Sequence, residues 1–131
     1  MDIKLRKLLE LARAVRKELE RVYPFKDMAG LCCCVSKTIH EKARAANIPV
    51  VFAYGTFNGW VHCWLEYDGN IIDATATQFG VIDKILVTPI SDTRYKPGEP
   101  GLCAKDPCAK SPKSRVTMRV CKDHGMMEAN T

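Results

Sequence analysis

The sequence predicts an α+β domain in which two N-terminal helices pack on an antiparallel sheet. Up to about residue 46, apolar residues recur at three- and four-residue steps, which is typical of amphipathic helices. From about residue 50 onward, segments rich in β-branched and aromatic residues are separated by turn signals, which is typical of strands. The 131 residues are enough for one core and too few for two cooperating domains, so we expect residues 1–131 to form a single domain.

The first helix is predicted over residues 3–22, and its apolar face consists of Leu5, Leu8, Leu9, Ala12, Val15, Leu19 and Val22. Tyr23-Pro24 ends it, because a residue before proline is disfavoured in the helical conformation. A second helix is predicted from about Cys32 to about Ala46, and Asn47-Ile48-Pro49 stops it.

Strands are predicted over residues 50–57, 61–67, 70–74, 84–88 and 114–120. Asn58-Gly59 and Asp68-Gly69 are turn dipeptides, so we expect the first three strands to pair as antiparallel hairpins. The C-terminal segment, residues 91–131, contains many cysteines and prolines and is expected to belong to the same domain. Because residues 91–113 hold four of the seven prolines, we expect that part to be irregular and exposed.

The composition excludes several classes of function. No stretch of about 18 apolar residues is present, so we expect no membrane-spanning segment. The N-terminus lacks the apolar region of a signal peptide, which favours a cytoplasmic location and leaves export by a dedicated secretion system open. The net charge of +5 is spread out without interleaved aromatic residues. We therefore expect no nucleic-acid partner, whereas an acidic partner or substrate stays open.

Three consecutive cysteines, Cys32 to Cys34, stand where a loop that contains Gly30 becomes a helix. The N–H groups and the positive dipole end of a helix N-terminus stabilise a thiolate, and they can also bind the oxyanion of a tetrahedral intermediate. Successive residues turn by about 100° around a helix, so only one of the three can be a nucleophile. Gly30 favours Cys32, because a residue without a side chain lets a substrate approach the sulfur. Cys33 and Cys34 remain its rivals.

His62 and Asp73 are predicted to be neighbours from the register of the second hairpin. If Asp68-Gly69 forms a two-residue turn, Trp64 pairs with Asp73 and His62 lies diagonally across from the carboxylate. A carboxylate in an apolar strand also requires a partner, because burying it unpaired costs on the order of several kcal/mol. We therefore predict that Cys32, His62 and Asp73 act as nucleophile, general base and orienting carboxylate.

Three blocks of sequence follow one another across about residues 28–80. They are Gly30-Leu31-Cys32-Cys33-Cys34-Val35-Ser36, His62-Cys63-Trp64-Leu65-Glu66 and Ile72-Asp73-Ala74-Thr75-Ala76-Thr77-Gln78-Phe79. In this order they resemble the transglutaminase-like branch of the papain-like cysteine enzymes. The resemblance implies a papain-like core with the same three catalytic residues. It leaves the polar donor of the oxyanion hole unmatched, and the candidates are Tyr23, Lys26 and Asp27.

The function that follows is a cysteine-dependent amide hydrolase, either a peptidase or a protein-glutamine deamidase, acting on a peptide or protein through a thioester without a cofactor. An acyltransferase with an amine acceptor would use the same residues, and a catalytically inactive binding module is a further alternative. Gly30, Trp64 and Gln78 are expected to support the site. Trp64 would cover the site or pack against the second helix. Gln78 would hold the strand end or, less favourably, contact the substrate.

The tail contains four side chains of the kind that binds zinc: Cys103, Cys108, Cys121 and His124. The spacing of the first two is at the long end of the usual range, and Asp106-Pro107 between them makes its own turn. We therefore expect exposed thiols rather than a metal site. A tail stapled by zinc belongs to the alternative of a binding module.

Overall fold

Helix α1 spans Ile3–Val22 and helix α2 spans Cys32–Ala45 in the computed structural model, which describes residues 2–23 and 31–98. Asp2 caps α1, because its carboxylate accepts a hydrogen bond of 2.8 Å from a backbone N–H of the first turn. Both helices lie where the apolar spacing predicts them, so this part of the prediction is confirmed.

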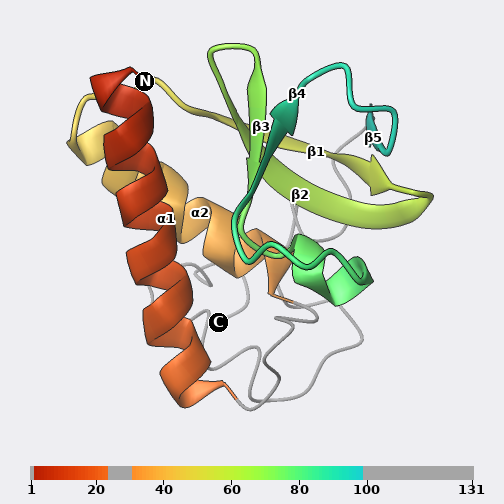
Figure 1. Cartoon of the computed structure of the whole chain (residues 1–131), viewed down its shortest axis with the longest axis horizontal. Helices are drawn as coiled ribbons and strands as arrows, with labels where there is room; N and C mark the ends of the chain where they lie inside the picture. Colours follow the sequence, from red (N-terminus) through yellow and green to blue (C-terminus); the bar gives the residue numbers. More distant parts are fainter. Residues whose placement is uncertain (1, 24–30, 99–131) are drawn as a thin grey trace, which may run out of the picture.

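Five antiparallel strands form one curled sheet (Figure 1). In the spatial order β4-β3-β2-β1-β5, it consists of β1 (Val51–Phe57), β2 (Trp60–Tyr67), β3 (Asn70–Asp73), β4 (Leu86–Pro89) and β5 (Tyr95–Pro97). A short 3-10 helix, η1 (Ala76–Phe79), follows β3. The predicted α+β class, with two N-terminal helices and an antiparallel sheet, is confirmed.

Both predicted hairpin turns are present. Asn58-Gly59 and Asp68-Gly69 all have positive φ, between 48° and 89°, which is the conformation of the type I′ turn. Such a turn fixes the register, and Leu65 pairs with Ile72 in β2 and β3 as the Asp68-Gly69 turn predicts. The ladder ends at that pair, so Trp64 and Asp73 lie just beyond it. This register determines which side chains of β2 face the helices.

Strand β5 contradicts the prediction that residues 91–113 are irregular. A turn held by Asp92 precedes it, because the Asp92 carboxylate accepts hydrogen bonds from Thr88 and from the backbone and guanidinium of Arg94. Pro97 is compatible with this strand, because β5 is at the edge of the sheet and needs fewer backbone donors. The predicted strand over 114–120 lies outside the described residues.

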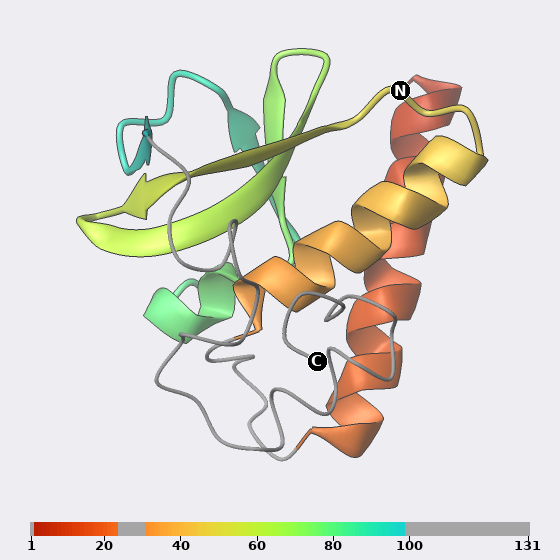
Figure 2. The ribbon, with the colours of Figure 1, turned by 180° about the vertical axis from the view of Figure 1, so that it is seen from behind.

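The two helices lie on one face of the sheet, and α2 packs against β1 and β2 while α1 packs against α2 (Figures 1 and 2). Cys63, Leu65 and Tyr67 of β2 belong to the cores on this helix side. The opposite face carries a second cluster, formed by Phe57, Trp64, Ile71 and Tyr95. His62, which alternates with Cys63, therefore lies on the same side of β2 as the aromatic cluster.

Candidate active site

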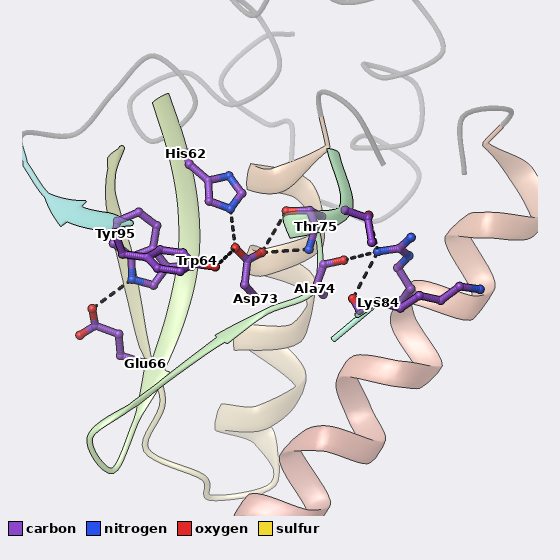
Figure 3. A network of polar contacts seen from close by, with 10 residues as sticks. His62, Trp64, Glu66, Asp73, Ala74, Thr75, Lys84 and Tyr95 are labelled. Carbon is purple, nitrogen blue, oxygen red and sulfur yellow. Dashed lines mark hydrogen bonds and ion pairs between the residues drawn. The ribbon is translucent and has the colours of Figure 1, made fainter. Parts of the chain in front are cut away.

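Asp73, the last residue of β3, is fully buried, and both of its carboxylate oxygens accept hydrogen bonds. Oδ2 accepts hydrogen bonds of 2.7 Å from His62 Nε2 and 2.7 Å from the Tyr95 hydroxyl. Oδ1 accepts from the Thr75 N–H at 2.9 Å and from the Thr75 hydroxyl at 3.3 Å. Figure 3 shows these donors converging on the carboxylate from three directions. The predicted contact between His62 and Asp73 is therefore present.

His62 is fully buried in β2, and its ring lies among the rings of Phe57, Trp64, Phe79 and Tyr95. Burial alone would lower the pKa of this imidazole, but the Asp73 carboxylate and the neighbouring Cys32 outweigh that effect and raise the pKa of His62 to about 10. At neutral pH the ring is therefore an imidazolium paired with Asp73. Its Nδ1 atom is buried and has no hydrogen-bond partner within the described part of the chain.

Cys32 is the first residue of α2, and 5% of its surface is exposed. The preceding Leu31 offers no side chain that could cap the helix, and the first turn contains no acidic residue. The positive end of the α2 dipole therefore has no carboxylate of its own to offset it. In both views η1, which follows Asp73 along the chain, lies beside this end of α2 (Figures 1 and 2).

The rival cysteines lie in different surroundings. Cys34 is part of the main apolar core, whereas Cys32, Cys33 and Cys63 form a separate buried cluster under Phe52 and Tyr54. Hydrogen bonding to Cys32 and Cys33, together with burial, raises the pKa of Cys63, so that thiol stays protonated. Of the three consecutive cysteines, Cys32 is the one whose interaction with His62 raises the pKa of the imidazole.

The supporting residues that the sequence predicts have mixed outcomes. Trp64 lies on the His62 face, with ring centroids 6.0 Å apart, and its indole N–H donates to Glu66 at 3.1 Å. Its neighbours in the core are Phe57, Ile71 and Tyr95, so the alternative of packing against the second helix is wrong. Gln78 lies in η1, where its backbone N–H donates to Thr75, consistent with a role in holding the strand end.

The other predicted residues lie away from the His62–Asp73 pair or outside the described residues. Of the oxyanion candidates, Tyr23 is buried in the main core. The remaining residues lie outside the described residues: Gly30, Lys26, Asp27 and the tail residues Cys103, Cys108, Cys121 and His124. Within residues 2–23 and 31–98, no group of three or more His, Cys, Asp or Glu side chains is placed to hold a metal ion.

Two residues that contact the site, Tyr95 and Arg16, belong to none of the motifs identified in the sequence. Tyr95 belongs to the segment that the sequence predicts to be irregular, so nothing marked it as a partner of Asp73. Arg16 is buried on the apolar face of α1, and it donates to the carbonyl oxygen of Ala74, the residue after Asp73, at 2.7 Å. Its spacing was the available signal, because Arg16 stands four residues after Ala12 on the stripe that faces the core.

A cavity of about 410 Å³ opens next to the aromatic wall of His62. It is lined by Phe57, Asn58, Trp60, Gln78 and Phe79. Phe79 contacts the His62 ring edge-on, with centroids 4.9 Å apart. Trp60 is 69% exposed at the rim. The described surface beside the histidine is therefore hollow and largely aromatic.

Comparisons with known proteins identify no relative: no protein-family model matches the sequence, and no curated protein or solved structure is significantly similar to it. Within the described residues, no helix has both the length and the apolar character needed to cross a membrane.

Proposed function

We propose that this protein is a cysteine-dependent amide hydrolase, a peptidase or a protein-glutamine deamidase, with a papain-like (transglutaminase-like) core and with Cys32, His62 and Asp73 as catalytic residues. The observation that carries the proposal is the fully buried His62–Asp73 pair beside the cysteine that begins α2. A buried ion pair adds little net stability, since desolvation offsets the attraction between the charges. Strongly shifted pKa values of this kind are concentrated at functional sites.

The chemistry follows from the charges of these three groups. The His62 imidazolium favours the thiolate of Cys32, which attacks the carbonyl carbon of an amide. The tetrahedral intermediate collapses to a thioester as His62 gives its proton to the leaving amine or ammonia. His62 then takes a proton from water, the hydroxide cleaves the thioester, and the Cys32 thiolate is restored. Asp73 holds the ring with Nε2 toward the carboxylate, so that Nδ1 is the nitrogen that carries the moving proton.

The start of α2 supplies a second element of the mechanism. The negative oxygen of the tetrahedral intermediate requires donors that are already oriented, and the backbone N–H groups at a helix N-terminus meet that requirement. Because the nucleophile is the first residue of the helix, the oxyanion would form next to these groups. One donor set therefore stabilises both the thiolate and the intermediate.

The proposal is tested by mapping the most reactive thiol. The folded protein is treated with sub-stoichiometric iodoacetamide at pH 7, and the labelled cysteine is identified by mass spectrometry. We expect Cys32 to be labelled first, and we expect His62→Gln to slow its labelling by about tenfold or more, because the paired thiolate is lost. His40→Gln is the matched control, since His40 lies half-buried farther along α2.

Activity is then measured as release of ammonia from capped glutamine peptides and as cleavage of peptide bonds in an unfolded protein. Cys32→Ala should abolish both, and Cys33→Ala should retain them. Equal and slow labelling of all the cysteines, or unchanged labelling in His62→Gln with folding verified by circular dichroism, would contradict the proposal.

A further inference from the structure

Arg16 is a buried cation far from the sequence motifs of the site. Its side chain is only 3% exposed, although it belongs to a helix whose buried face is otherwise apolar. Nη1 donates to the carbonyl oxygen of Ala74 at 2.7 Å, to the Thr77 hydroxyl at 3.0 Å and to the carbonyl oxygen of Lys84 at 3.3 Å. Nε donates to Glu20 at 2.9 Å. The guanidinium thus binds α1 to the chain that follows β3.

The Ala74 carbonyl and the Thr75 N–H belong to one peptide group, which is planar and rigid. Its oxygen accepts the hydrogen bond from Arg16, and its N–H donates to Asp73 Oδ1 at 2.9 Å. The other carboxylate oxygen, Oδ2, accepts from His62 at 2.7 Å. A single hydrogen-bonded line therefore runs from the guanidinium through one peptide group and one carboxylate to the imidazole. Figure 3 shows its part from Ala74 through Thr75 and Asp73 to His62. Hydrogen bonds in such lines polarise one another.

We propose that Arg16 is a positioning residue for the His62–Asp73 pair, acting through the Ala74–Thr75 peptide group. The inference rests on the proposed function only in so far as the pair serves Cys32. Arg16 fixes the tilt of the peptide plane, and the plane fixes the rotation of the Asp73 carboxylate. Without Arg16 the Thr75 N–H no longer points at Asp73 Oδ1. The carboxylate then rotates more freely, and its hydrogen bond to the His62 imidazolium weakens.

A neighbouring contact helps to distinguish a positioning role of Arg16 from a purely structural role, in which Arg16 would only link α1 to the segment after β3. Lys84 Nζ pairs with Glu20 at 3.1 Å, and it joins the same helix to the same segment without touching the Ala74–Thr75 peptide group. The Lys84 side chain is 65% exposed, so its loss leaves no buried group unpaired. Lys84→Met is therefore the matched control for Arg16→Met.

The experiment measures the pKa of His62 by NMR and the rate of Cys32 alkylation by iodoacetamide across pH 5–10, in wild type, Arg16→Met, Arg16→Lys and Lys84→Met. All four proteins retain the titratable residues described around the ring, which are Cys32, Asp73 and Tyr95. We expect Arg16→Met to bring the pKa of His62 down toward 6.5 and to slow alkylation at pH 7 by about tenfold, the effect of losing one charge-assisted hydrogen bond. Lys84→Met should match wild type.

Arg16→Lys keeps a cation that can reach the Ala74 carbonyl, so it should restore part of both readouts, and it serves in place of Arg16→Met if that variant does not fold. If the Arg16 variants melt at a lower temperature but keep the wild-type pKa of His62 and the wild-type alkylation profile, the role of Arg16 is purely structural and the inference is overturned. If wild-type Cys32 itself shows no preferential alkylation, the proposed function fails, while the pKa of His62 still tests the role of Arg16.

Discussion

Oxygen Oδ2 of Asp73 accepts two hydrogen bonds at once, from His62 and from Tyr95. Burial and the adjacent Asp73 charge raise the pKa of Tyr95 well above its ordinary value, so the hydroxyl remains a donor over the working range of pH. The same ring packs against Trp64, with centroids 5.0 Å apart. Tyr95 therefore joins the carboxylate to the aromatic cluster on the far face of the sheet.

Tyr95→Phe removes the hydroxyl and keeps the ring, so it isolates the hydrogen bond to Asp73. We expect the free energy of unfolding to fall by about 1.5–3 kcal/mol, the range for a hydrogen bond to a charged group. Urea denaturation measures the change. Tyr67→Phe is the control, because the Tyr67 hydroxyl also donates to a carboxylate at 2.7 Å, that of Asp2, but in a more exposed setting. Equal losses in the two variants would show that burial of the Tyr95 bond has no effect.

At the residue scale, the sequence predicts the His62–Asp73 contact because the two residues share a hairpin whose turn sets the register. The positive φ angles of Asp68 and Gly69 leave little freedom in that register. The contact between Asp73 and Tyr95 spans 22 residues and depends on how the intervening chain folds back. Local patterns contain no information on such a path, so Tyr95 could not be predicted.

At the scale of the elements, the pairing of β5 with β1 depends on one glycine. Gly55 pairs with Pro97, and a Cβ at position 55 would overlap the carbonyl group of Lys96. A strand without a side chain at that point lets the edge strand approach closely. This contact holds Tyr95, the first residue of β5, against Phe57.

Gly55→Ala should push β5 away from β1. We expect a loss of about 1–3 kcal/mol in the free energy of unfolding, typical of overpacking, together with slower alkylation of Cys32, because Tyr95 moves away from Asp73. Gly98→Ala is the matched control, since a Cβ there would meet its nearest atom at an ordinary 3.8 Å. Wild-type stability in Gly55→Ala, measured by urea denaturation, would refute this account of the β1–β5 pairing.

The same scale explains which elements the sequence predicts. Both helices and the first two hairpins follow from apolar spacing and turn dipeptides, which are local signals. Strand β5 has three residues, one of them Pro97, and it exists because β1 offers a free edge beside Gly55. A strand this short has no periodicity of its own, so the prediction of an irregular segment was wrong there.

For the whole molecule, the charge of His62 links the site to global stability. Its pKa is raised from 6.5 to about 10 in the folded protein, so folding favours the protonated form. Below pH 6.5 the folded and unfolded states are both protonated and the contribution is complete. Between 6.5 and about 10 the unfolded chain loses its proton while the folded protein keeps it, so the contribution shrinks as the pH rises and is lost above about 10.

We therefore expect the stability advantage of wild type over His62→Gln to decline steadily from pH 6.5 to about pH 10, as measured by urea denaturation at fixed ionic strength. His40 provides a contrast of opposite sign. Burial and the charge of Arg44 lower the pKa of His40. As the pH falls below the ordinary pKa of histidine, the unfolded chain therefore gains a proton at His40 before the folded protein does, and stability is lost. Parallel stability curves for wild type and His62→Gln would show that the charge of His62 has no influence on folding.

The contact between β5 and Asp73 also imposes an order on the assembly of the protein during its synthesis. Arg16, His62 and Asp73 leave the ribosome before Tyr95, which comes 22 residues after Asp73. A nascent chain that ends before β5 lacks both the tyrosine donor of the carboxylate and the edge strand that contributes Tyr95 to the aromatic cluster. Cys32 and the His62–Asp73 pair are thus synthesised early, and Asp73 obtains its Tyr95 donor late, when most of the described sheet already exists.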